Sequence, residues 1–250
     1  MKHYFRNLLT IAFVGLVTPA AAQQSAGQKL KSLSVLELFT SQGCSSCPPA
    51  DAVFQSYAKR QDVVALSMPV DYWDYLGWKD TLANPAFSRR QRNYARTRGD
   101  GAVYTPQVII NGQQHYIGSS RREIDGGLQT SSPEQAVVSV AVRENPGELN
   151  VELEAIKDGP IAPYSVWLVA VQREIKVEVQ AGENRGRTVT YFNVVREISN
   201  LGIWKGGTVK LSHLFQVAAP NLPSYHYALL VQKTGGNEII HASWLGKTGS

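Results

Sequence analysis

Both cysteines of this 250-residue chain lie in one motif, Cys44 and Cys47 in the spacing C-x-x-C. The apolar run 33–39 before the motif has the length and composition of a buried strand. Residues 50–59 after it have the spacing of an amphipathic helix, so we predict the motif at a strand-to-helix turn. The free N–H groups and positive dipole end of a starting helix stabilise a thiolate, which favours a reactive cysteine pair.

The elements predicted after the motif have a recognisable order. A second apolar strand is expected over 63–70, and a helix over 85–98, capped by Asn84 and stopped by Gly99. A hairpin then turns at Asn111-Gly112, and a short helix covers 121–128. Strand, helix, strand, helix, hairpin, helix, with C-x-x-C after the first strand, is the order of thioredoxin-like proteins. We therefore predict an α/β thioredoxin-like domain over residues 33–132.

Thr105 and Pro106 stand at the mouth of the predicted hairpin. Thioredoxin-like proteins carry a cis-proline there, beside the cysteine pair, with the backbone of the preceding residue facing the substrate. We predict a cis peptide bond at this position, because such bonds are structurally costly and usually mark a site. The alternative is a proline that simply starts an edge strand.

The pattern changes after residue 132. Short β-rich runs separated by turn residues replace the helical periodicity, which predicts an all-β antiparallel sandwich-like domain over 133–250. The expected strands are 137–142, 149–156, 165–171, 175–179, 188–195, 208–214 and 225–233.

The N-terminus has the features of a secretory signal peptide. Lys2 and Arg6 precede the apolar run 8–17, and a small-residue A-x-A site follows at 20–22. We predict cleavage after Ala22, with an uncleaved anchor as the alternative. A signal peptide and an oxidisable cysteine pair predict a periplasmic or secreted protein that has no membrane contact after cleavage.

Four separated motifs, at 37–51, 70–78, 104–107 and 182–188, together resemble a family of secreted bacterial proteins catalogued as domain of unknown function 1223 (DUF1223). The resemblance extends over essentially the whole mature chain. It implies a thioredoxin-like N-terminal domain with an appended β-rich region, and it brings no settled activity. It also suggests that the glycine-rich tip 182–187 docks against the first domain, with Arg185 and Arg187 near the cysteines.

The predicted function is thiol–disulfide oxidoreductase chemistry at the cysteine pair. Cys44 is the candidate attacking thiolate and Cys47 the resolving partner. Ser45 and Ser46 lie between them and offer hydroxyls that can hydrogen-bond a thiolate. The prolines at 48–49 are expected to delay the start of the helix and so to weaken the stabilisation of Cys44.

Three further residues are candidates for the site. Glu37, in the first strand, is either a buried acid that manages the proton of the resolving thiol, or a residue that faces solvent or pairs with an arginine of the 89–98 helix. Trp73 and Trp78, in a block dense in aromatic and acidic residues, are candidates for the rim of a substrate groove.

Two alternatives to redox catalysis stay open, both of which describe a non-catalytic binding module. In the first alternative, the cysteine pair is a structural disulfide. Against this, cross-linking so short a loop restricts little of the unfolded chain. Alternatively, the thiolates hold copper(I) with His115 as a third ligand. The other histidines lack metal-ligand spacing, so we assign no metal ligand and no cofactor.

The expected partner is a protein or small-thiol redox substrate, and the oligomeric state cannot be predicted. The chain is mildly basic, with a formal net charge of +5, and has no lysine or arginine block. The arginines of helix 85–98 are interpreted as a solvated helix face, and no nucleic-acid partner is expected.

Overall fold

The computed structural model describes residues 27–131, 137–156, 162–215 and 225–246. The predicted signal peptide therefore lies outside the described residues. The described residues contain three α-helices, α1 (Cys47–Ala58), α2 (Pro85–Arg98) and α3 (Arg121–Thr130), with the short 3-10 turn η1 (Asp74–Leu76). The strands are β1 (Gln28–Lys29), β2 (Ser34–Thr40), β3 (Val63–Pro69), β4 (Gln107–Ile110), β5 (Gln114–Ile117), β6 (Val138–Asn145), β7 (Glu148–Ala155), β8 (Tyr164–Glu178), β9 (Thr188–Trp204), β10 (Thr208–Leu214), β11 (His226–Lys233) and β12 (Ile239–Trp244). None of these helices is both long and apolar enough to span a membrane.

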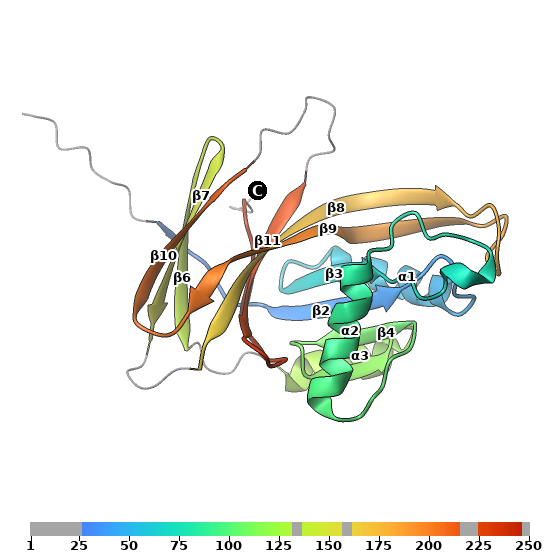
Figure 1. Ribbon diagram of the computed structural model, residues 1–250, viewed down its shortest axis with the longest axis horizontal. Coiled ribbons are helices and arrows are strands. Elements are labelled where there is room, and N and C mark those ends of the chain that lie inside the picture. The colour runs from blue at the N-terminus through green and yellow to red at the C-terminus, as the bar shows by residue number, and fades with distance from the viewer. Residues whose placement is uncertain (1–26, 132–136, 157–161, 216–224, 247–250) are drawn as a thin grey trace, which may run out of the picture.

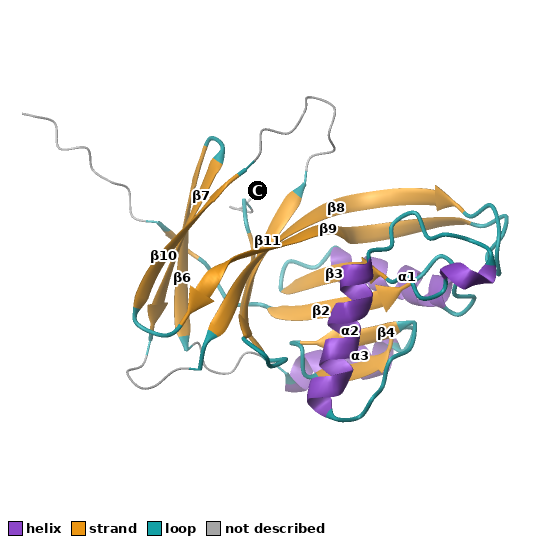
Figure 2. Cartoon of the chain, in the orientation of Figure 1, coloured by secondary structure: helices purple, strands orange, loops and turns teal. Residues whose placement is uncertain are grey.

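The described chain is a mixed α/β structure built on two sheets (Figure 2). The larger sheet has eight strands in the order β12-β11-β8-β9-β3-β2-β4-β5, and the smaller has four in the order β1-β6-β7-β10. A parallel contact between Ser67 of β3 and Val194 of β9 connects the two halves of the larger sheet. The predicted boundary at residue 132 lies outside the described residues, and the larger sheet contains strands from both sides of it.

Helices cover both faces of the N-terminal part of the larger sheet. All residues of β2 and β3 are buried, as expected for strands that are covered on two sides. Leu36 and Leu38 of β2 pack with Phe54 of α1 on one face, which α3 also covers. Phe39, on the other face, packs with Phe87 of α2. Figure 1 shows α2 in front of the sheet, with α1 and α3 behind it.

The other end of the larger sheet forms a two-layer sandwich with the smaller sheet. The inward residues of β6 and β7, such as Val140 and Leu153, alternate with more exposed neighbours. They pack on Val166, Trp204 and Leu229 of the larger sheet. This apolar layer agrees with the predicted sandwich, and the short strand β1, in a segment without a predicted element, adds an edge to it.

The long hairpin β8–β9 connects these two ends of the molecule. Residues 165–171 and 175–179 were predicted as separate strands, which is wrong, because β8 continues through the polar segment between them. That segment remains paired with β9, for example Glu174 with Phe192, so its exposure does not interrupt the strand. Figure 1 shows both strands running from the sandwich to the opposite end of the protein, beside α1. β12 was not predicted.

Most helix and turn boundaries were predicted correctly from local sequence rules. Helix α2 begins and ends as predicted: Asn84 Oδ1 accepts the N–H of Ala86 at 2.9 Å, and Gly99 terminates the helix with φ +80°. The hairpin turn is also confirmed, with positive φ at both Asn111 and Gly112. Helix α1 differs from the prediction, because it begins at Cys47 and not three residues later. Prolines are tolerated there because the first helical turn requires no N–H from them.

Candidate functional site

The cysteine pair lies between the end of β2 and the start of α1. Cys44 and Cys47 form a disulfide with a Cα–Cα distance of 5.4 Å. Their residue surfaces are 3% and 0% exposed, whereas Ser45 and Ser46 between them are exposed. Ser46 Oγ lies 3.3 Å from Cys44 Sγ and can donate to it. Cys44 is therefore the sulfur nearer the surface, and the two serines form the exposed rim of the site.

The predicted cis peptide bond between Thr105 and Pro106 is confirmed. The carbonyl oxygen of Thr105 lies 3.8 Å from Cys44 Sγ, so the proline loop directly contacts the disulfide. The hydroxyl of Thr105 accepts a hydrogen bond from Trp73 Nε1 at 2.7 Å. These contacts bring together three segments that are widely separated in sequence.

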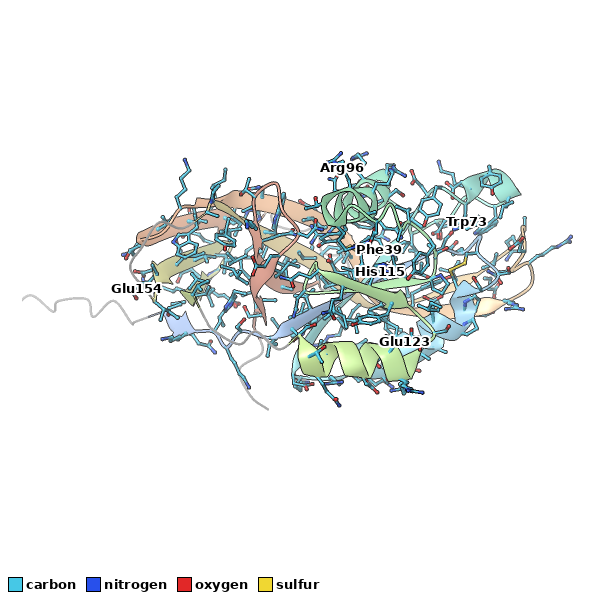
Figure 3. All side chains as sticks on the ribbon, turned by 90° about the horizontal axis from the view of Figure 1, so that it is seen from below. Phe39, Trp73, Arg96, His115, Glu123 and Glu154 are labelled. Atoms are coloured by element: carbon cyan, nitrogen blue, oxygen red, sulfur yellow. A yellow bond between two sulfur atoms is a disulfide. The ribbon has the colours of Figure 1, made fainter. Side chains whose placement is uncertain are left out.

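The two predicted tryptophans have different surroundings. Trp73 lies beside the disulfide in Figure 3, and its ring stacks on that of Tyr75, which is 76% exposed. A Cβ atom at Gly43 would lie 3.1 Å from the Trp73 Cβ, so the glycine allows this close approach. Trp78 instead donates to Gln42 Oε1 at 2.8 Å, and so contacts the loop that precedes the cysteines.

The tip of the β8–β9 hairpin docks on the cysteine loop. Asn184 is 1% exposed, and its side-chain amide donates to the carbonyl oxygens of Gln42 at 2.9 Å and Cys44 at 2.8 Å. Glu183 Oε2 accepts the N–H of Ser45 at 3.2 Å. Docking was suggested by the family resemblance, but with Arg185 and Arg187 near the cysteines. These two arginines are exposed, and Glu183 and Asn184 make the contacts.

A buried acid lies one helical turn after Cys47. Asp51 is 4% exposed. Thr40 Oγ1 donates to its Oδ1 at 2.9 Å, and its Oδ2 has no hydrogen-bond partner in the described part of the chain. Burial raises the pKa of Asp51 well above its usual value, the Thr40 hydrogen bond opposes this shift, and the nearby Asp80 carboxyl adds to it. Asp51 was not predicted from the sequence as a site residue, although its position four residues after Cys47 places both on one helix face.

Glu37 pairs with an arginine, which is one of the alternatives that its sequence context allowed. It is fully buried and accepts hydrogen bonds from Arg90 Nε at 2.7 Å and from Tyr94 Oη at 2.5 Å. Both donors belong to α2, on the sheet face opposite α1. The predicted solvated face is therefore wrong for Arg90, whose side chain is only 13% exposed, and for Arg98, which is 12% exposed and pairs with Asp100 at 2.7 Å.

His115 is engaged away from the cysteines. Its Nδ1 lies 2.9 Å from Tyr104 Oη, and its Nε2 lies 3.3 Å from Asp100 Oδ2. Among the described residues, no three His, Cys, Asp or Glu side chains are grouped as metal ligands. The copper(I) alternative would therefore have to rely on the two cysteines alone or on a ligand from elsewhere.

Fold and site together define a mixed α/β protein of two sheets that carries a C-x-x-C disulfide. The chain belongs to the family described as "Protein of unknown function (DUF1223)", whose model matches residues 35–232. It is also similar to a crystal structure of protein AGR_C_4864 from Agrobacterium tumefaciens, with 32% sequence identity and a TM-score of 0.73. That match covers 88% of this chain and 98% of the other.

A second solved structure is similar in fold alone. HBP35 of Porphyromonas gingivalis is 14% identical, with a TM-score of 0.56, and the match covers 89% of this chain and 80% of that one. No curated protein matches the chain. The comparisons identify the family but assign no activity, so a functional proposal must rest on the site.

Proposed function

We propose that residues 33–132 form a thioredoxin-like domain and that the protein is a thiol–disulfide oxidoreductase using Cys44 and Cys47. The observation that carries this proposal is the 3.8 Å contact between Cys44 Sγ and the carbonyl oxygen of Thr105, the residue before the cis-proline. A substrate segment that extends along this backbone would bring its sulfur to Cys44. The parallel β2–β3 pair and the hairpin β4–β5 on the other side of β2 support the domain assignment.

The chemistry is a pair of thiol–disulfide exchanges. A substrate thiolate attacks Cys44 Sγ, the Cys44–Cys47 bond breaks, and its electron pair leaves on Cys47 Sγ. A second substrate thiolate then attacks the substrate sulfur of the mixed disulfide and releases Cys44. Two electrons pass from the substrate, which becomes a disulfide, to the cysteine pair, which becomes two thiols. Reduction of a substrate is the same sequence in reverse.

Asp51 is the group best suited to supply a proton when Cys47 leaves. Because burial raises its pKa, the carboxyl keeps its proton at higher pH than an exposed aspartate would. Residues one helical turn apart have Cβ atoms about 5–6 Å apart, so Asp51 and Cys47 are neighbours on α1. Asp51 also lines a groove between α1 and the β8–β9 hairpin, which gives a route for proton exchange with solvent.

The substrate surface would consist of the exposed serines and the aromatic pair beside the disulfide. Tyr75 and Trp73 provide an apolar surface, while Ser45 and Ser46 provide hydroxyls. Such a surface suits a protein segment or a small thiol, which is the substrate class predicted from the sequence. Thiol oxidation or isomerisation also fits the periplasmic or secreted location that we propose from residues 1–22.

The near-complete burial of the cysteines favours a second candidate function, a structural disulfide in a binding module. Cys44 is 3% exposed, and a substrate sulfur must approach it along the S–S axis. A closed pair would fix the loop against Asn184. The two functions differ in whether a thiol can reach Cys44 in the folded protein.

Trapping tests the proposal. The Cys47→Ser variant has no second thiol that could displace glutathione from Cys44. Glutathione disulfide should therefore convert reduced Cys44 to a stable mixed disulfide, detected by intact mass. Cys44→Ser is the matched control, and its fully buried Cys47 should react far more slowly. Equal, slow modification of both variants in the folded state would contradict the proposal and support the structural alternative.

A further inference from the structure

A cationic cleft lies between α2 and the turn that joins β11 to β12. Its volume is about 370 Å³, within the range of small-molecule sites. Of the residues that the structure describes, four cationic ones and no acidic one line it. The cations are Arg89, Arg90, Arg96 and Lys233. Arg96 on α2 lies well apart from the disulfide in Figure 3, so the cleft is separate from the cysteine site.

The charge available to a ligand comes from three of these cations. Arg90 is neutralised by its buried ion pair with Glu37 at 2.7 Å. Arg89, Arg96 and Lys233 are exposed, and none has an ion-pair partner within the described parts of the chain. Like charges gathered around a concave surface raise the local concentration of counter-ions, so the cleft attracts anions.

Buried hydrogen bonds make the cleft floor rigid. Arg90 Nη1 donates to Gln232 Oε1 at 3.0 Å, and Gln232 Nε2 donates to Tyr94 Oη at 3.1 Å and to the Asn237 carbonyl at 2.9 Å. The Asn237 side chain in turn donates to the carbonyl of Tyr94 at 2.9 Å. The helix and the β11–β12 turn are thus held in fixed relative positions, which lowers the ordering cost of binding.

Two buried donors in the cleft wall have no acceptor among the residues that the structure describes. They are Arg90 Nη2 and Trp167 Nε1, and nearly all buried polar groups in proteins have a hydrogen-bond partner. Both atoms are covered by neighbouring side chains, so the exposed cations would make the first contact with a ligand. Trp167 and Ile198 add an apolar wall to the cleft.

We propose that this cleft binds a small organic anion, with a phosphate or carboxylate group held by Arg89, Arg96 and Lys233. The body of the ligand packs on Trp167 and Ile198. This inference is independent of the redox proposal, because it uses none of the residues of the cysteine site.

The test uses phenyl phosphate as the probe, which combines a doubly charged group with a flat apolar body. Isothermal titration should give saturable binding at one site per chain, and inorganic phosphate should bind at least tenfold more weakly. In Arg89→Gln/Lys233→Gln the affinity for phenyl phosphate should fall at least tenfold. Both side chains are exposed, and an unchanged melting temperature confirms that the variant is folded.

Arg92→Gln/Arg122→Gln is the matched control, because it also removes two positive charges, from exposed positions that do not line the cleft. It should bind phenyl phosphate as the unmodified protein does. Absence of saturable binding would overturn the proposal. Equal loss in the Arg92/Arg122 control would also overturn it, because the affinity would then reflect only the net charge. Equal affinity for inorganic phosphate would overturn the role of the apolar wall.

Discussion

The side-chain amide of Asn184 donates to the backbone carbonyl of Cys44 at 2.8 Å, across 140 positions of sequence. This hydrogen bond connects the tip of the β8–β9 hairpin to the loop that carries the disulfide. The same amide donates to Gln42, so a single side chain holds the loop at two points. The β-rich C-terminal part of the chain is therefore part of the surroundings of the cysteine site.

Asn184→Ala should loosen the cysteine loop. Two buried carbonyl groups lose their donor, so we expect the free energy of unfolding to fall by about 1–3 kcal/mol. Reduction of the disulfide by a small phosphine in the native state should become faster. Arg185→Ala, at an exposed position of the same tip, should change neither quantity; similar effects of both variants would show that Asn184 has no special role.

Glu37→Gln should destabilise the protein strongly. Removing one member of a buried ion pair leaves Arg90 uncompensated, at a cost of about 3–5 kcal/mol measured by urea unfolding. The double variant Glu37→Gln/Arg90→Met should recover much of this loss. Asp62→Asn breaks the exposed pair with Arg60 and should cost less than about 1 kcal/mol. If Glu37→Gln lowered the free energy of unfolding by as little as Asp62→Asn, the structural role of the Glu37–Arg90 pair would be contradicted.

Asp51 should make stability decrease with rising pH. Its folded-state pKa is raised by burial, so the folded protein retains a proton that the unfolded chain loses above about pH 3.9. The free energy of unfolding therefore falls as pH rises toward the folded-state pKa, at a slope of up to about 1.4 kcal/mol per pH unit. Asp51→Asn should reduce this dependence in urea titrations between pH 4 and 9, with the remainder due to Asp80, whose pKa burial also raises. It should also slow the exchange step in which Cys47 Sγ is the leaving group. Unchanged pH dependence would contradict the assignment.

His241 should contribute in the opposite direction. It is 2% exposed, and burial lowers its pKa to about 4. Because the unfolded chain binds this proton near pH 6.5, stability should be lost as pH falls from about 6.5 through about 4. The loss amounts to about 3 kcal/mol at the acid end. His241→Gln should reduce it, with His213→Gln, at a half-buried position, as the control; the same acid profile in both would contradict this prediction.

The sequence predicted features that depend on neighbouring residues and missed those that depend on the β8–β9 hairpin. Asn84 and Gly99 define both ends of α2, and Asn111 with Gly112 defines a turn, because capping and positive φ are local properties. Asp51 lies at a position from which its proximity to Cys47 could have been inferred. The burial of Asp51 could not have been inferred, because β9, which covers it, is more than a hundred residues away in the sequence.

Long-range pairing explains the remaining differences. No local signal connects Asn184 to the cysteines, and only the family resemblance suggested docking of the tip. The contact between Glu37 and Arg90, 53 positions apart, was one of several that the sequence allowed. Strand β8 was divided in the prediction because polar residues interrupt its apolar pattern, whereas its pairing with β9 keeps it extended.

The reduction potential of the Cys44/Cys47 pair tests the redox proposal most directly. Equilibration in glutathione buffers, with intact mass as the measure of oxidation, gives its value. The proposal predicts a potential between about −270 and −120 mV, the range of known thioredoxin-like catalysts, and the value would also indicate the direction of electron flow. A potential below about −300 mV would identify a structural disulfide and contradict the oxidoreductase function.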